Sequence, residues 1–194
     1  MTRVAVVPAA PVLLARHAGL VDPVPELRAA CAAAVDWVVV GARGPVTALC
    51  AGPSPADRAR GVVTSHGGQL AAELLGEALG ELVAGPVTGP VASLAGRDLL
   101  VLADGSARRG EKAPGHLDPR ATAYDDEVGA ALASGDLSRL RDLDVALGEE
   151  LWAEGAPVLR ALAGAVEPSG ASEVLFSGDP FGVQYWVLTW TAGS

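Results

Sequence analysis

The segment 104–116 holds a dense group of side chains that could bind or act on a ligand. It follows directly on the apolar run 98–103, which we expect to be a central strand, and sites in open α/β sheets form at the carboxyl ends of the strands. The segment is therefore a candidate ligand site; the alternative is a solvated loop whose charges pair with one another. Its polar members are Asp104, Ser106, Arg108, Arg109, Glu111, Lys112 and His116.

The three histidines could hold a metal ion if the fold brought them together. His17 follows the first predicted strand, His66 follows the loop after the third, and His116 lies in the segment 104–116. All three could then lie at one edge of the sheet. None of them has the short spacing that is typical of local metal-ligand pairs, so the alternative is three unrelated surface imidazoles.

Motifs for nucleophilic catalysis and for phosphate binding are missing from the sequence. No Gly-x-Ser-x-Gly turn is present, and Ser65 and Ser106 lie in other contexts. Cys31 falls within a predicted helix and Cys50 within a predicted strand, so we expect two buried free thiols in a reducing cytoplasm; the alternative is a disulfide between them. Neither the Gly-x-Gly-x-x-Gly pattern nor the Walker pattern occurs, which disfavours a nucleotide-binding function.

Length and charge exclude several classes of protein. The chain has 194 residues, of which 50% are hydrophobic, and a formal net charge of −9. This length predicts a single domain over residues 1–194, and the hydrophobic fraction excludes global disorder. The negative charge argues against nucleic acid and anionic membranes as partners, because both require clustered cations. Neither a transmembrane run of about 18 apolar residues nor an apolar signal core is present, so we expect a cytoplasmic protein.

Short apolar runs alternate with alanine-rich helical runs, which predicts an α/β fold with a mixed sheet flanked by helices. The strands expected to lie side by side in the sheet interior are apolar on both faces; they are 4–7, 37–40, 98–103 and 182–190. Further expected strands are 46–50, 173–176 and a short one within 85–96. The expected helices are 26–35 with Asp22-Pro23 as its cap, 70–83, 118–133, 136–143 and 147–166 with a bend near Pro157, and 52–61 is an expected surface loop.

Several stretches resemble, in order along the chain, the class III (LigB-type) extradiol ring-cleaving dioxygenases. The stretch 6–14 resembles the opening strand and loop of that family, and 100–109 resembles its central strand and active-site loop. The stretches 113–119 and 123–125 match a short actinobacterial branch of the family, and 181–187 resembles its closing strand. The resemblance implies a LigB-like fold for the single domain.

The resemblance also implies a metal site whose ligands this chain lacks. Active members of the family hold a non-haem Fe(II) with two histidines and a glutamate, and a further histidine acts as acid and base. At the positions that match the three histidines this chain has Ala9, Arg43 and Arg108, and Glu173 is the nearest candidate for the glutamate. Because an arginine stays protonated and cannot ligate iron, we expect the fold without the cofactor and without the chemistry of the family.

We therefore expect a catalytically silent LigB-like protein that binds a small anionic ligand, or a partner protein, in the former active-site pocket. Arg43 and Arg108 are expected to approach one cavity beside Ala9, where two guanidinium groups would suit a carboxylate or phosphate. The alternatives are an active dioxygenase whose metal site has moved to the three histidines, and a non-catalytic subunit that pairs with a homologous chain or a second copy. The candidate pocket residues are Ala9, Arg43, Asp104, Ser106, Arg108 and His116.

Overall fold

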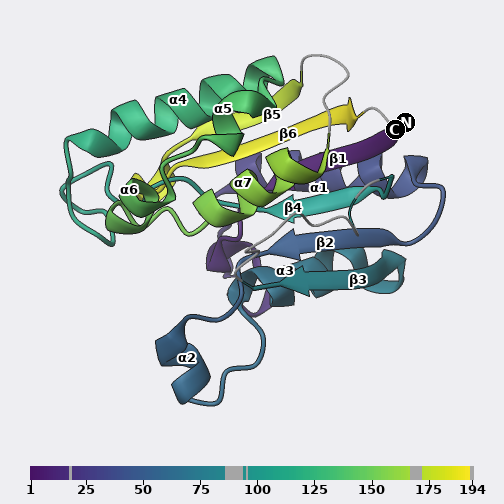
Figure 1. Cartoon of the computed structure of the whole chain (residues 1–194). Helices are drawn as coiled ribbons and strands as arrows, with labels where there is room; N and C mark the ends of the chain where they lie inside the picture. The colour runs from purple at the N-terminus through teal and green to yellow at the C-terminus, as the bar shows by residue number, and fades with distance from the viewer. Residues whose placement is uncertain (18, 86–93, 95, 167–171, 193–194) are drawn as a thin grey trace.

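The computed structural model describes residues 1–17, 19–85, 94, 96–166 and 172–192, and within these ranges six strands form one sheet. They are β1 (Thr2–Val7), β2 (Val46–Cys50), β3 (Leu79–Ala84), β4 (Leu99–Leu102), β5 (Glu173–Gly178) and β6 (Tyr185–Ala192). Their order in space is β3-β2-β4-β1-β6-β5 (Figure 1). The first four strands run parallel, whereas β6 runs antiparallel to β1 and β5 runs antiparallel to β6. The predicted α/β fold with a mixed sheet is therefore confirmed.

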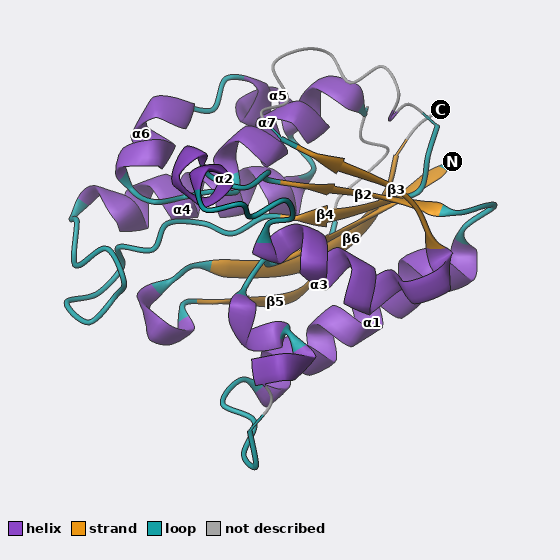
Figure 2. Cartoon of the chain, turned by 90° about the horizontal axis from the view of Figure 1, so that it is seen from below, coloured by secondary structure: helices purple, strands orange, loops and turns teal. Residues whose placement is uncertain are grey.

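Helices cover both faces of the sheet (Figure 2). One face packs against α1 (Pro25–Gly41) and α3 (His66–Leu75). The other packs against α4 (Arg120–Ser134), α5 (Leu137–Arg141), α6 (Val145–Glu150) and α7 (Ala156–Ala165). The short helix α2 (Pro55–Ala59) projects from the body of the molecule (Figure 1). In the described ranges no helix combines the length and the apolar character that crossing a bilayer requires.

Three of the four strands predicted to be interior, 4–7, 98–103 and 182–190, correspond to β1, β4 and β6 in the middle of the sheet. Strand β4 lies between β2 and β1, and β6 lies between β1 and β5. Every residue of β4 is buried, as both faces of a parallel strand under two helical layers must be. The carboxyl ends of the parallel strands and the amino end of β6 meet at one side of the sheet, which we call the carboxyl edge. The opposite side is the amino edge.

The prediction of a strand at 37–40 is wrong, because these residues form the last turns of α1. Val38 is buried one helical turn beyond Ala34, on the helix face that packs on the sheet, whereas Val40 is 85% exposed. Burial of that face outweighs the preference of β-branched valines for strands. The strand that pairs with β4 on this side of the sheet is β2.

The helix predicted for 70–83 is two elements. Helix α3 ends at Leu75, and the next residue, Gly76, has a φ of +50°, in the left-handed region that favours glycine. After one 3-10 turn the chain continues as β3, which pairs in parallel with β2. The leucines whose spacing suggested one long helix are shared between a helix and an edge strand.

The long helix predicted for 147–166 is interrupted between α6 and α7. Trp152 lies in the connection with a φ of +58°, and Pro157 stands in the first turn of α7, where proline is tolerated. A Cβ atom at Gly155 would lie only 2.5 Å from the backbone nitrogen of Asp104. The break therefore lets the start of α7 approach the end of β4 closely.

Smaller expectations also need correction. Asp22 does not cap α1 but forms an ion pair with Arg28 at 2.8 Å. The loop expected at 52–61 contains α2, whose N-cap is Ser54. Most of the segment 85–96, for which we considered a short strand, lies outside the described residues.

Candidate functional site

A hydrogen bond between two predicted site residues joins the ends of β1 and β4. The backbone N–H of Ala9, just after β1, donates to the carboxylate of Asp104, just after β4, at 2.6 Å. Burial raises the pKa of Asp104 to about 7; the hydrogen bond from Ala9 opposes this shift, and the charge of Glu154 adds to it. The surroundings of the Asp104 carboxyl group thus disfavour its charged form.

The buried hydroxyl of Ser106 is bound to Asp125 on α4. The Ser106 backbone N–H donates to one carboxylate oxygen of Asp125 at 2.8 Å, and the Ser106 hydroxyl donates to the other at 2.5 Å. Both side chains are almost inaccessible to solvent. Burial raises the pKa of Asp125, while Ser106 and Arg109 act in the opposite direction. Two hydrogen bonds from one residue therefore fix the segment after β4 on the start of α4.

The guanidinium group of Arg109 completes this network. Its Nε donates to Asp179, in the turn between β5 and β6, at 3.0 Å. Its Nη1 lies 3.4 Å from Asp125 and 3.9 Å from Asp126, both on α4. The Arg109 side chain is only 14% exposed. One arginine thus links the segment 104–116, helix α4 and the β5–β6 turn.

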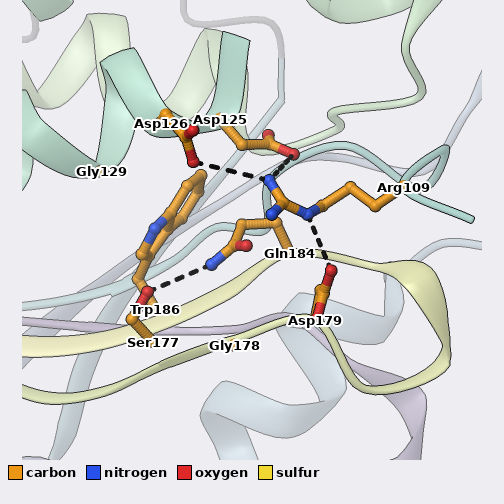
Figure 3. Close-up of a pocket in the computed structure, with 9 residues that line it drawn as sticks. All are labelled: Arg109, Asp125, Asp126, Gly129, Ser177, Gly178, Asp179, Gln184 and Trp186. Atoms are coloured by element: carbon orange, nitrogen blue, oxygen red, sulfur yellow. Dashed lines mark hydrogen bonds and ion pairs between the residues drawn. The ribbon is translucent and has the colours of Figure 1, made fainter. Parts of the chain in front are cut away.

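Arg109 borders a cavity of about 420 Å³, which we call the Arg109 pocket. Figure 3 shows that α4 forms one wall and the β5–β6 hairpin the other. The aromatic side chain of Trp186 lies in the pocket beside Gly129, where a Cβ atom would be 2.9 Å from the indole nitrogen. The lining residues are Arg109, Asp125, Asp126, Gly129, Ser177, Gly178, Asp179, Gln184 and Trp186.

Gln184 presents an acceptor atom to the Arg109 pocket. Its Nε2 donates to the hydroxyl of Ser177 at 3.3 Å and to the backbone carbonyl of Tyr185 at 3.0 Å. The carbonyl can only accept, so the amide nitrogen must face it and the orientation of the amide is defined. Gln184 is 5% exposed, and within the described residues its Oε1 accepts no hydrogen bond (Figure 3).

The prediction that Arg43 and Arg108 approach one cavity is wrong. The backbone N–H of Arg43 donates to Asp98, which precedes β4 at the amino edge. Arg108 follows β4 at the carboxyl edge, where its Nη1 donates to the carbonyl of Glu150 at 3.0 Å. Because α1 continues to Gly41, Arg43 follows a helix that returns to the amino edge, and does not follow a strand that would end at the carboxyl edge.

The charges of the segment 104–116 also do not pair with one another as a solvated loop would. Arg108 lies 3.7 Å from Asp118, and Arg109 binds Asp125 and Asp179. The segment is therefore anchored to the rest of the molecule. Among the predicted pocket residues, the structure brings Ala9 next to Asp104; Ser106 joins the Arg109 network, and His116 is exposed with a φ of +56°.

The described residues do not fit the iron site that the family resemblance implies. Ala9 offers no donor atom, and Glu173 begins β5 at the amino edge, far along the sheet from Asp104. In the parts of the chain that the structure describes, no three histidine, cysteine, aspartate or glutamate side chains gather as a metal site. The alternative metal site made of His17, His66 and His116 is therefore wrong, because these three described side chains do not gather at one point.

Sequence reasoning missed most of the Arg109 pocket. Asp179 and Gln184 stand near the closing strand that carries the family resemblance, but they were not candidate residues. Trp186 lies in the predicted interior strand 182–190, and it is 4% exposed while it also lines the pocket. The one available signal was Gln184 itself, a polar residue at the start of an otherwise apolar strand.

Comparisons with known proteins support the fold alone. No protein-family profile matches the sequence, and a search of curated proteins gives no match. Among solved structures, the chain is similar to the uncharacterized protein JW3007 from Escherichia coli K12, with a TM-score of 0.55 and 12% sequence identity. The match covers 98% of this chain and 100% of that protein. An identity this low shows a shared fold and carries no function from one protein to the other.

Proposed function

We propose that the protein is a catalytically silent, LigB-like protein that binds a small polar molecule in the Arg109 pocket without a metal ion. The observation that carries this proposal is the cavity of about 420 Å³ against which a buried network holds Arg109. Its volume falls in the range of about 300–1,000 Å³ that is common for small-molecule sites. Six of its nine lining residues carry polar or charged side chains, which suits a polar molecule.

The absence of catalysis is supported by the residues at the matching family positions. Ala9 has no metal-binding atom, and the Arg108 side chain is directed to Glu150 and Asp118. The carboxylate of Asp104 lies next to Ala9. It accepts the hydrogen bond from the Ala9 N–H and so links the ends of β1 and β4. These side chains offer neither two imidazoles nor an acid–base histidine, so the chemistry of the family has no residues to perform it.

The positions of the three candidate arginines indicate where a ligand would bind. Arg43 and Arg108 lie at opposite ends of β4 and cannot share an anion. Arg109, in contrast, borders the cavity directly. A cytoplasmic location remains part of the proposal, supported by Cys31 and Cys50, which are both buried and free.

Isothermal titration calorimetry tests the proposal. The full chain, treated with EDTA, is titrated with a panel of small amines, carboxylates and amino acids. Ser177 lines the pocket from β5, so Ser177→Tyr should fill it, whereas Val174→Tyr places the same bulk on an exposed part of β5 that does not line the pocket.

We expect at least one compound to bind the EDTA-treated protein. Its affinity should fall by about tenfold or more in Ser177→Tyr, a loss of about 1.4 kcal/mol, and remain unchanged in Val174→Tyr. The proposal is contradicted if no compound binds, if Ser177→Tyr binds as well as the wild type, or if binding requires added Fe(II) or Zn²⁺.

A further inference from the structure

We infer that residues 151–155, which we call the α6–α7 connection, form a pH-sensitive latch controlled by the protonation of the Asp104 carboxyl group. In acid the neutral carboxyl group lets the connection close over the end of β4. Near neutral pH the charge on the carboxylate favours release of the connection. The latch lies outside the Arg109 pocket and does not depend on a ligand there. Its parts are a close packing contact, an unbalanced buried charge and a strained residue.

The α6–α7 connection packs directly against the backbone of Asp104. A Cβ atom at Gly155 would lie 2.4 Å from the carbonyl oxygen of Asp104 and 2.5 Å from its nitrogen. Leu151, at the start of the connection, is fully buried, and its carbonyl accepts a hydrogen bond from the backbone N–H of Ala107 at 3.1 Å. The closed connection therefore covers Asp104 and is fastened to the segment that follows it.

The backbone of Asp104 is held in the sheet on both sides. The N–H of Ala103 donates to the carbonyl of Val7, at the end of β1, at 2.9 Å. The N–H of Gly105 donates to the carbonyl of Gln184, just before β6, at 2.8 Å. Because these bonds fix Asp104 in place, the part that can move to admit water to its carboxylate is the α6–α7 connection.

No positive charge balances the carboxylate of Asp104. It accepts the hydrogen bond from Ala9 N–H, but no basic side chain in the described ranges forms an ion pair with it. The titratable groups that face it are Glu154 in the connection, Tyr185 on β6 and Cys31 on α1. Burial raises the pKa values of Tyr185 and Cys31, so both stay neutral, whereas Glu154 adds a second negative charge. Ionised Asp104 thus repels the connection that covers it.

Trp152 shows that the closed connection is strained. Its φ of +58° lies in the left-handed region, which is unfavourable for a bulky residue. Its side chain gains little burial in return, because it is 53% exposed. Release of the connection would let Trp152 return to an ordinary backbone conformation. The strain and the charge on Asp104 therefore favour the same movement.

The sign of the pH dependence follows from the two states of Asp104. In the closed state, burial raises its pKa to about 7, and in the open state we expect a value near the ordinary 3.8. Between these two values the closed state keeps a proton that the open state loses. The opening equilibrium should therefore rise with pH, by up to about tenfold per unit, and level off above about pH 7.

Hydrogen exchange of the full chain, followed by NMR from about pH 5 to about pH 8, tests the latch. Each rate is divided by that of an unstructured peptide at the same pH. The N–H of Ala107 reports release, because it bonds to Leu151, and the N–H of Val101, in the middle of β4, reports global unfolding. The variants are Asp104→Asn and the matched pair Glu154→Gln and Glu149→Gln. Both glutamates are exposed, but only Glu154 acts on Asp104.

We expect the normalised exchange of Ala107 to exceed that of Val101 by about tenfold or more, and to rise by about tenfold or more between about pH 5 and about pH 7. Asp104→Asn should remove this rise. Glu154→Gln should move the level region to lower pH by about half a unit, and Glu149→Gln should leave it in place. The inference is overturned if Ala107 exchanges no faster than Val101, if Asp104→Asn keeps the rise, or if the two glutamine variants behave alike.

Discussion

Ala9 and Asp104, which are 95 residues apart in the chain, are joined by a 2.6 Å hydrogen bond at the carboxyl edge of the sheet. This bond links the ends of two neighbouring parallel strands, β1 and β4. The proposed resemblance to the extradiol dioxygenases would place a metal-binding histidine at Ala9. In this chain Ala9 contributes a backbone N–H to a contact between strands.

The raised pKa of Asp104 predicts how stability depends on pH. Because its folded-state pKa of about 7 exceeds the ordinary value of 3.8, the folded protein keeps a proton that the unfolded chain has lost. Its contribution to the free energy of unfolding is therefore fully present below about pH 4 and is lost as the pH rises to about 7. We expect Asp104→Asn, which keeps an acceptor for Ala9 N–H, to be more stable than the wild type by roughly 2–4 kcal/mol at about pH 8 and by little at about pH 4, as measured by urea unfolding.

Asp118 is the control with the opposite sign. Hydrogen bonds from Arg120 lower the pKa of Asp118 to about 2. The stabilisation by Asp118 is thus present above about pH 4 and lost as the pH falls toward 2. Asp118→Asn should be less stable than the wild type at neutral pH and approach it in acid. A similar profile for Asp104→Asn would contradict the raised pKa of Asp104.

Removing Asp125 should be costly. In Asp125→Ala the N–H and hydroxyl groups of Ser106 lose their partners in the interior, and Arg109 loses one of its carboxylates. We expect a loss of about 3–5 kcal/mol in the free energy of unfolding, and a smaller loss of about 1–3 kcal/mol for Ser106→Ala. Asp126→Asn, on the exposed side of the same helix, should stay within about 0.5 kcal/mol of the wild type. A loss below about 1 kcal/mol in Asp125→Ala would mean that water replaces the network.

Two glycines near opposite ends of α7 should respond in opposite directions to the same substitution. A methyl group at Gly155 would collide with the backbone of Asp104, so Gly155→Ala should destabilise the protein by about 1–3 kcal/mol. Gly164 has open space around it, and Gly164→Ala should stabilise the helix by about 0.5–1 kcal/mol. Thermal unfolding of both variants checks this pair. Equal effects would show that α7 does not approach the end of β4 as closely as the structure indicates.

The two cysteines should be unreactive in the folded protein. Burial raises the pKa of Cys31 to about 12 and also raises that of Cys50, which lies 3.8 Å from the Ser65 hydroxyl. Since the thiolate is the reactive form, we expect both thiols to react with Ellman's reagent much more slowly in the native protein than in urea. Fast labelling of either thiol in the native protein would be inconsistent with its burial.

The interior strands could be predicted because their residues are apolar on both faces. A short segment of this kind is expected only where both of its faces are buried. The same criterion failed at 37–40, where a run of valines after Trp37 is equally compatible with a buried helix end. Periodicity cannot distinguish the two over so short a run. That error also made the predicted position of Arg43 wrong, because a strand ending at Val40 would have placed Arg43 at the carboxyl edge.

The Arg109 pocket could not be predicted in the same way. Its charged groups come from the segment after β4, from α4 and from the β5–β6 turn. Asp125 meets Arg109 because of the face that α4 turns toward the sheet. Asp179 meets Arg109 because of the register of β5 on β6. Both are properties of tertiary packing, and neither leaves a local pattern in the sequence.

The central claim is that a small molecule occupies the Arg109 pocket without a metal ion, and an NMR titration tests it most directly. The EDTA-treated, ¹⁵N-labelled full chain is titrated in turn with the compounds of the calorimetric panel while the indole N–H signals of the four tryptophans and the backbone signals of Gly129 and Gln184 are followed. We predict that with at least one compound the signals of Trp186, Gly129 and Gln184 shift together and saturate, while that of Trp37, which lies near the amino edge beside Arg3, stays in place. Shifts confined to other regions, or shifts that arise only after Fe(II) or Zn²⁺ is added, would contradict the account.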